Sequence, residues 1–550
     1  MDAPNPARGG GAAGLREFGL VVLAAAALTA ALTYPIAFKL GSVGRVDNGD
    51  GRLSIWNVAW VARTLVVDPL HVFDANIFYP HRGTLAYSEN NLGAGALAVP
   101  VYWATRNPYA AHNFAMLLAF VLSATGMFYL VRHLTGDRRA AAISAIGFAF
   151  CPFVFAHTAH IQLLMTAGLP FTMLAFHRLV ARPSPGRGTV LGGAMAAQAI
   201  FCGYYGVYVV LMVAFAIAVV VVAGRRWGER RFLTAVALAA TTAVLLVLPA
   251  FLPYLSLQRD AGFRRELNDA VRYSASWSDY LASSSYAHGW LRLYLPPWTE
   301  VSFPGVVILG FGGWGAWVAA RDRRRELLVL YGGLALLACW ASFGPRAWLY
   351  SALYRTVPML AWLRAPARFG LIVDFCLAVL AGIGVSALLE RVRRPLVVAA
   401  ALALVTAAEL RVQVFMPPAP AVEPVYRTLA TLPPGPVIEM PFFYPQVGLF
   451  QHTRYMLAST AHWMPMVNGY SDYIPPDFYE HVMLLAPFPS RDAFKILEPN
   501  HVRYAVFHMN GYNAENRRDV LARLQQFEAY LRPLYMDGSL RLYEIIGFPP

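Results

Sequence analysis

Two arginines, Arg364 and Arg368, stand on either side of Pro366 just before a long apolar run. Guanidinium groups bind phosphate oxygens as planar forks, so the phosphate of an anionic lipid is a natural ligand for this pair. Ion pairing is the alternative explanation, but few acidic residues lie near these two arginines in the sequence. We therefore predict that Arg364 and Arg368 bind a phosphate.

Two histidines end another apolar stretch. His157 and His160 are three residues apart, so on a helix they would share one face. Such a pair can bind a divalent metal or a phosphate, or can simply hydrogen-bond at a membrane interface. Because the sequence shows no third metal ligand, we favour the wall of a polar cavity over a metal site, and Gln162 fits such a wall. A divalent metal stays possible, and no cofactor is firmly predicted.

Four weaker candidates could line the same cavity. Asp374 lies about two turns inside an apolar run, and an ionisable group in a membrane is costly to bury and often functional. Pairing with an arginine near the aqueous end is its ordinary explanation. Glu89 and the pair Tyr204 and Tyr205 could contact a sugar, because sugars stack on aromatic rings, although interfacial tyrosine is common.

An acidic turn, Asp47-Asn48-Gly49-Asp50-Gly51, precedes a segment in which Trp56 and Trp60 are one helical turn apart. Because Trp favours the membrane interface, we predict a helix lying along the membrane surface. Asp50 would lie just before this helix, near the mouth of a cavity. Two roles are open for it: an N-cap in ordinary turn chemistry, or a reactive carboxylate. The acidic spacing of a calcium-binding EF-hand loop is missing.

The elements that must position these residues are membrane spans. The chain has 550 residues, of which 57% are hydrophobic and only 14% are charged, a balance too apolar for an ordinary soluble protein. Its net charge of +14 comes from short arginine clusters between apolar runs, so we expect no nucleic-acid partner. A spanning helix needs about 20 apolar residues. Eleven runs fit, near 17–37, 111–131, 139–156, 161–180, 188–203, 205–223, 233–255, 304–320, 327–343, 369–389 and 396–413.

Arginine clusters lie between alternate runs. They consist of Arg132, Arg138 and Arg139; Arg178, Arg182 and Arg187; Arg225, Arg226, Arg230 and Arg231; Arg321, Arg323, Arg324 and Arg325; and Arg391, Arg393 and Arg394. Since cytoplasmic loops carry excess basic residues, these loops and Arg8 and Arg16 predict a cytoplasmic N-terminus and an extracytoplasmic C-terminus. We expect a multi-pass protein of a bacterial inner (plasma) membrane. The polar segments 38–110, 257–303, 344–367 and 414–550 are then outside.

The predicted organisation has three parts: a cytoplasmic tail 1–16, a transmembrane domain 17–413 with the large outer loop 38–110, and an extracytoplasmic α/β domain 414–550. A retained anchor explains the first run better than a signal peptide. Residues 91–104 are too short and broken for a span, and we expect them to be re-entrant or interfacial. In the C-terminal part, strands are predicted at 436–440, 502–507 and 540–546, and an amphipathic helix at 515–532.

This pattern resembles the GT-C superfamily of polytopic glycosyltransferases that use polyprenyl-phosphate sugars. The likeness rests on an acidic first outer loop, a surface-lying helix after it, about eleven spans and a C-terminal extracytoplasmic domain. Members carry their catalytic carboxylate in this loop, which implies that role for Asp50 or Asp47. Many members have a second acidic pair in the next outer loop, whereas residues 155–162 read FAHTAHIQ. This departure puts metal dependence in doubt.

The resemblance implies an inverting transfer. Asp50, helped or replaced by Asp47, would deprotonate an acceptor hydroxyl that attacks a polyprenyl-phosphate sugar. Arg364 and Arg368 would stabilise the leaving phosphate, with His157 and His160 as candidate partners. The acceptor would be a glycan, lipid or protein of the cell envelope. Two alternatives remain: a transporter or flippase without chemistry, and a non-catalytic binder of lipid-linked glycan. No motif for soluble nucleotides is present.

Overall fold

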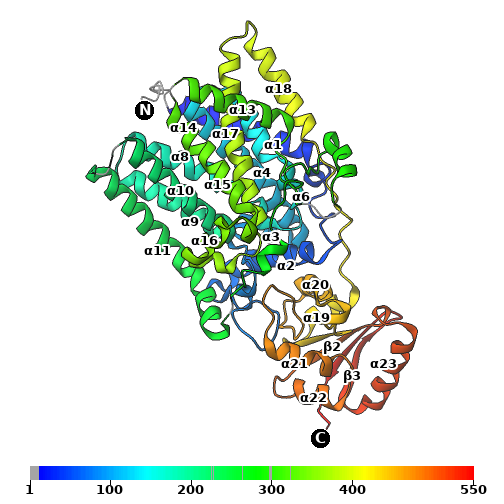
Figure 1. Cartoon of the computed structure of the whole chain (residues 1–550). Helices are drawn as coiled ribbons and strands as arrows, with labels where there is room; N and C mark the ends of the chain where they lie inside the picture. Colours follow the sequence, from blue (N-terminus) through cyan, green and yellow to red (C-terminus); the bar gives the residue numbers. More distant parts are fainter. Residues whose placement is uncertain are drawn as a thin grey trace. The chain divides into compact units, whose positions relative to one another are not determined.

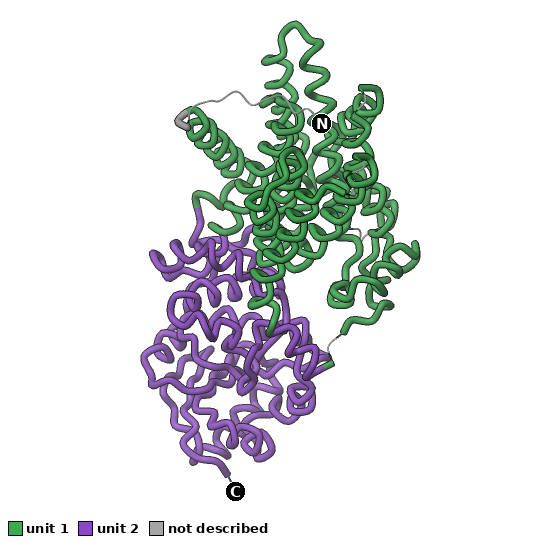
Figure 2. The backbone as a smooth tube through the Cα atoms, turned by 90° about the vertical axis from the view of Figure 1, so that its left-hand side faces the viewer, with its two compact units in different colours: residues 1–38, 114–252, 262–415 green, residues 39–113, 253–261, 416–550 purple. Residues whose placement is uncertain are grey.

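The computed structural model describes residues 11–224, 226, 228–262, 264–296, 300–322 and 324–549. Most of the predicted cytoplasmic tail, with Arg8, lies outside these residues, as do Arg225 and Arg323 of the predicted arginine clusters. The chain forms two compact units, coloured separately in Figure 2. Unit 1 contains residues 1–38, 114–252 and 262–415, and unit 2 contains residues 39–113, 253–261 and 416–550.

Unit 1 is helical. Its longer helices are α1 (Gly11–Leu32), α4 (Pro108–Thr135), α5 (Arg138–Ala149), α8 (Gly168–Ala181), α9 (Pro185–Phe201), α10 (Gly203–Gly224), α11 (Arg230–Ala261), α13 (Val306–Arg321), α15 (Gly333–Ser342), α17 (Gly370–Leu389) and α18 (Pro395–Glu409). The first residues of α4 and the last residues of α11 belong to unit 2. Short pieces connect them, among them α6 (Pro152–Ala156), α7 (Ile161–Leu164), α12 (Asp269–Arg272), α16 (Leu349–Thr356) and the 3₁₀ turn η8 (Pro366–Phe369).

Eight helical segments of the described chain are long and apolar enough to cross a membrane. They coincide with eight of the eleven predicted runs. The other three runs form the helices α9, α13 and α18, which have 17, 16 and 15 residues and fall short of the candidate spans in length. Eight of the eleven predicted spans are therefore confirmed as candidate spans. The protein is a multi-pass helical membrane protein.

Helix α17 packs along α13 at very short range (Figure 1). Small residues make this possible, since a Cβ atom on Gly315 would lie 1.8 Å from the carbonyl oxygen of Leu380, and one on Gly384 would lie 2.5 Å from that of Phe311. Close helix approach through small residues is the usual packing mode in a membrane. It fixes α17, which carries Asp374 and follows directly after Arg368.

Unit 2 contains a four-stranded sheet in the order β1-β2-β4-β3. The strands are β1 (Val437–Met440), β2 (Tyr504–His508), β3 (Leu531–Met536) and β4 (Leu540–Ile545). Strand β1 is parallel to β2, and the other pairs are antiparallel. The predicted strands β1, β2 and β4 are confirmed, whereas β3 was not predicted.

Five helices accompany this sheet in the sequence: α19 (Pro424–Thr431), α20 (Thr453–Ala458), α21 (Pro476–Leu485), α22 (Arg491–Leu497) and α23 (Ala514–Gln526). The small C-terminal α/β region is therefore confirmed. The predicted helix 515–532 is too long, because α23 ends at Gln526 and its last predicted residues enter β3.

The first loop belongs to the same unit and supplies α2 (Gly49–Val67) and α3 (Leu92–Thr105). Segment 91–104 is thus a regular helix, 14 residues long with Pro100 inside it. Trp56 and Trp60 are only 1% and 7% exposed, and their indole nitrogens donate to Asn76 Oδ1 (3.2 Å) and to the carbonyl of Val72 (2.9 Å). The prediction that both rings anchor a surface helix in the membrane interface is therefore wrong, because they pack in the core of unit 2.

Candidate functional site

Arg364 and Arg368 share one aromatic neighbour in unit 1. The Cζ atom of Arg368 lies 4.2 Å from the ring centre of Tyr204, at the start of α10. The backbone nitrogen of Arg364 donates to the hydroxyl of Tyr204 (3.1 Å), and its guanidinium lies 5.3 Å from the ring of Tyr273. A backbone bond from Ala367 to the carbonyl of Tyr273 (3.0 Å) holds the two loops together. Both arginines are thus fixed against aromatic faces.

The two histidines lie in the link between α6 and α7, so the prediction of one shared helix face is wrong. Their ring centres are 6.4 Å apart. His157 bonds through Nδ1 to the carbonyl of Phe153 (2.7 Å), and its Nε2 lies 3.6 Å from Oε2 of Glu300. Burial, followed by the charges of Arg368, His157 and Arg364, lowers the pKa of His160 to about 3. His160 is therefore neutral at physiological pH.

Glu300 is the acidic member of this group. Its close contact with His157 lowers the pKa of the Glu300 carboxyl, and the charge of Arg368 acts in the same direction against the effect of burial. The structure thus brings Arg364, Arg368, His157, His160 and Tyr204 into one electrostatic neighbourhood, which we call the arginine–histidine cluster. Glu300 and Tyr273 belong with it and were not predicted.

Three other predicted residues of unit 1 differ in their surroundings. Tyr205 is fully buried and donates to the carbonyl of Leu163 (2.9 Å), which makes it a structural anchor. Gln162 is half-buried on α7, close in sequence to the histidines. Asp374 is 1% exposed, and neither of its oxygens has a hydrogen-bond partner within the described chain. The expected pairing of Asp374 with an outer arginine is not formed.

In unit 2, the cap of α2 is Asn48 and not Asp50. The helix begins at Gly49, and the side chain of Asn48 accepts from the backbone nitrogen of Gly51 (2.8 Å). Asp50 therefore lies in the first turn and not before the helix, with its side chain exposed. A carboxylate at this end is favoured by the helix dipole. Because the capping role is filled by a neighbour, helix capping does not explain Asp50.

Asp47 is engaged by its neighbours. Nε and Nη2 of Arg45 donate to its two oxygens at 3.0 and 3.2 Å, and Asn48 donates at 3.2 Å. Partial burial raises the pKa of Asp47, but the hydrogen bond and charge of Arg45 outweigh it and lower the pKa overall. Arg52, which lies near both Asp47 and Arg454, has its own pKa lowered by burial and by Arg454. Asp47 is thus held as a carboxylate and is a weak proton acceptor.

Glu89, the remaining predicted residue, is half-buried in unit 2. Its backbone carbonyl accepts a hydrogen bond from the side chain of Asn57 on α2 (3.0 Å). Asp47, Asp50 and Glu89 thus belong to unit 2, and the other predicted site residues belong to unit 1.

A further titratable group of unit 2, not predicted, is centred on Glu439 in β1. Its side chain is fully buried, and Oε2 accepts from Tyr426 (3.2 Å) and His508 Nε2 (2.9 Å). Asn468 bonds to both the backbone nitrogen (2.7 Å) and the carbonyl (2.9 Å) of Glu439. Desolvation raises the pKa of Glu439, although His508 and Tyr426 oppose it.

A resident metal does not fit the candidate residues. Within the described ranges, no three His, Cys, Asp or Glu side chains converge as metal ligands. Both oxygens of Asp47 already accept from a guanidinium, and the His157–Glu300 pair stands beside Arg368, whose charge repels a cation.

Residues 105–256 match the family model described as "Dolichyl-phosphate-mannose-protein mannosyltransferase". The matched segment includes His157, His160 and Tyr204 of the arginine–histidine cluster. A search of the curated proteins finds no match to this sequence.

Among solved structures, the chain is similar to the archaeal oligosaccharyltransferase AglB from Archaeoglobus fulgidus, in complex with an inhibitory peptide and a dolichol-phosphate. That likeness has 13% identity and a TM-score of 0.47, and it covers 94% of this chain and 72% of that one. It is also similar to ArnT from Cupriavidus metallidurans, in the apo state (13% identity, TM-score 0.40) and bound to undecaprenyl phosphate (14%, 0.41), each covering 97% of this chain and 98% of that one.

The chain thus combines a helical membrane architecture with a similarity, through residues 105–256, to this mannosyltransferase family model.

Proposed function

We propose that this protein transfers a sugar from a polyprenyl-phosphate donor to an acceptor hydroxyl of the cell envelope, with inversion at the anomeric carbon. The observation that carries the proposal is the arginine–histidine cluster, in which both guanidinium groups act on His160, and Arg368, His157 and His160 have Glu300 as acidic neighbour. The family description names a dolichyl-phosphate sugar, which is a donor of this chemical class.

The cluster suits a lipid phosphate for two reasons. Arg368 and Arg364 lie against Tyr204 and Tyr273, so their forks are oriented before a ligand arrives, and little side-chain entropy is lost on binding. His160 is neutral, so it can donate one hydrogen bond to a phosphate oxygen without adding charge. We therefore assign donor-phosphate binding to Arg364 and Arg368, with His157 and His160 beside them.

In the proposed reaction, the acceptor oxygen forms a bond to the anomeric carbon while the bond from that carbon to the phosphate oxygen breaks. The acceptor proton passes to a carboxylate, and the lipid phosphate leaves as an anion that the arginines stabilise. We assign the base to Asp50, because Asp47 is held by Arg45 and has a lowered pKa. Gln162, Tyr204, Tyr205 and Asp374 are proposed only as supports of the phosphate site in unit 1.

We further propose that the N-terminus is cytoplasmic and that the reaction takes place outside the bacterial inner membrane, because the arginine clusters alternate along the chain. Reporter fusions after residues 136 and 292 test this arrangement. A fusion after 136 should be active only with a cytoplasmic reporter, and one after 292 only with an exported reporter. The reverse pattern would contradict it.

The decisive test is Asp50→Asn in purified protein reconstituted with a labelled polyprenyl-phosphate sugar. We expect transfer to fall by about 10²-fold or more, because a positioned base contributes roughly 10²–10⁴. Asp68→Asn, at the other end of α2, is the matched control because Asp68 is exposed and forms a local ion pair with His71, three residues away. Near-normal transfer by a folded Asp50→Asn protein would overturn the assignment. Donor binding without any turnover by the unmodified protein would instead indicate a non-catalytic binder.

A further inference from the structure

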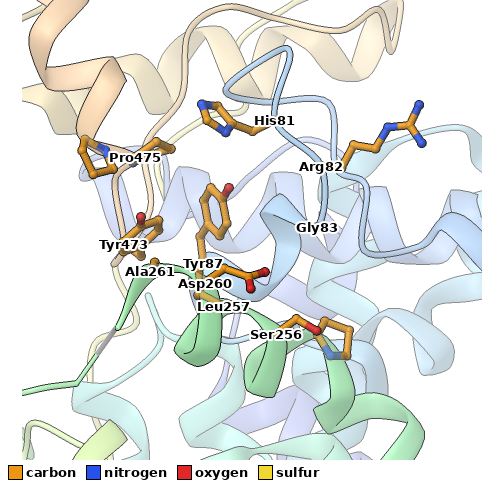
Figure 3. Close-up of a pocket in the computed structure, with 12 residues that line it drawn as sticks. His81, Arg82, Gly83, Tyr87, Ser256, Leu257, Asp260, Ala261, Tyr473 and Pro475 are labelled. Carbon is orange, nitrogen blue, oxygen red and sulfur yellow. The ribbon is translucent and has the colours of Figure 1, made fainter.

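Unit 2 contains a cavity of about 320 Å³ that holds none of the residues assigned to the reaction. Three segments of unit 2 line it: the loop around His81–Tyr87, the last turns of α11 from Pro253 to Ala261, and the stretch from Tyr473 to Pro476. Figure 3 shows His81 and Arg82 on the loop side, Tyr87 and Tyr473 in the middle, and Asp260 and Ser256 on the α11 side.

The aromatic wall of this cavity is rigid. The rings of Tyr87 and Tyr473 pack edge to face, with centres 5.0 Å apart at 79°. The backbone nitrogen of Tyr473 donates to the carbonyl of Tyr87 (2.8 Å), so the two segments are tied together beneath the rings. Burial raises the pKa of Tyr87 to about 12, which keeps its hydroxyl as a hydrogen-bond donor.

The loop side is also fixed. His81 Nε2 lies 2.9 Å from Asp477, which sets the orientation of the imidazole. Gly83 has a φ of +67°, a conformation that favours glycine. Its backbone nitrogen donates to the side chain of Asp74 (2.8 Å), and this hydrogen bond fixes the turn that carries Arg82.

The α11 side is joined to the same loop by Tyr254. Its hydroxyl donates to the carbonyl of Ser88 (2.7 Å) and accepts from Asn90 (3.1 Å). Ser256 and Asp260, on the next turns, are thereby held at the cavity. All three walls are therefore built before a ligand binds, which lowers the entropic cost of binding.

The chemistry of the lining favours a neutral polyol. Arg82 and Asp260 balance one another in charge, and His81 is already paired with Asp477, so the cavity lacks the excess of cations that a phosphate needs. Tyrosine and proline faces offer apolar contact to the C–H face of a sugar ring, while serine, carboxylate, imidazole and guanidinium groups can hydrogen-bond its hydroxyls. The volume lies near the lower end of ligand sites, about 300–1,000 Å³.

We propose that this cavity binds a saccharide of one or two rings. We assign this saccharide to the acceptor glycan. That assignment rests on the proposed transferase function, whereas saccharide binding by itself does not.

The test uses the full-length protein in lipid nanodiscs and saturation-transfer NMR with methyl glucoside, methyl mannoside, methyl galactoside, maltose and cellobiose. We expect at least one of these probes to bind, and Asp260→Asn and Ser256→Ala each to weaken it at least fivefold. Asp492→Asn is the matched control, because that carboxylate is 67% exposed on α22. Asp50→Asn should keep saccharide binding even though it loses transfer, which separates the two proposals.

Three results would overturn the inference: no probe binds the unmodified protein, both cavity variants bind as well as the control, or inorganic phosphate displaces the saccharide. Melting temperatures of the variants within about 2 °C of the unmodified protein exclude misfolding as the cause of a loss.

Discussion

Removal of the Arg368 side chain should separate recognition of the lipid phosphate from recognition of the lipid tail. Its guanidinium lies 4.2 Å from the ring of Tyr204 and interacts electrostatically with His160 and Glu300. A hydrogen bond to a charged group contributes about 1.5–3 kcal/mol. Loss of a donor that stabilises a developing anion costs about 10²–10³ in turnover. We therefore expect Arg368→Ala to lower kcat by about 10²–10³-fold.

Arg368→Lys should recover part of this loss, because an ammonium group keeps the charge but cannot form the planar fork or the same stack on Tyr204. Arg355→Ala is the matched control, since Arg355 is exposed in α16 of the same predicted outer segment.

The assay measures equilibrium binding of undecaprenyl phosphate and of undecaprenol to protein in nanodiscs, together with transfer. Arg368→Ala should weaken binding of the phosphate at least tenfold and leave binding of the alcohol unchanged. Unchanged phosphate binding, or an equal loss for both lipids, would refute the phosphate role of Arg368.

Three further outcomes follow from the same structure. Trp56→Ala should destabilise unit 2 by about 3–5 kcal/mol in denaturant unfolding, as for other large-to-small changes in a core. A destabilisation below about 1 kcal/mol would contradict core packing of Trp56 and would fit a ring in the membrane interface. Glu439 has a raised pKa, so its contribution to stability is full below its ordinary pKa of 4.5 and is lost as pH rises through the raised value. Glu439→Gln should remove this decline, measured as the melting temperature at pH values between 4 and 8. An unaltered slope of melting temperature against pH would argue against this role of Glu439. Treatment with EDTA should leave transfer within about twofold of its initial rate, because arginines provide the charge that a metal would otherwise provide; activity restored only by added Mg²⁺ or Mn²⁺ would contradict this.

The sequence was sufficient to predict the helices and most of the sheet. Long apolar runs have few alternatives to a helix in a membrane, and the β-branched and aromatic residues of β2 and β4 have clear strand patterns. Strand β3 was missed because Pro533 interrupts it and its first residues continue the helical spacing of α23. Proline is tolerated there because β3 lies at the edge of the sheet.

The candidate site was predicted only in part. Arg364 and Arg368 could be found because basic residues on the expected outer side need a partner. Glu300 could not, because nothing local in the sequence relates it to His157, and only the fold brings the two side chains to 3.6 Å. The rings of Trp56 and Trp60 were assigned to the membrane interface because helical spacing shows that two side chains share a helix face. It does not show which part of the molecule packs on that face.

The make-up of unit 2 determines when its core can form during synthesis. Asn76 donates to Ser459 and to the carbonyl of Met464, which is 388 residues further along the chain. Phe78 packs edge to face on Phe478 at 5.0 Å. At about 5–20 residues per second, the ribosome needs roughly 20–80 s to make these partners. Until then the first loop lacks these partners, so we expect the core of unit 2 to be incomplete in a nascent chain that stops before Met464.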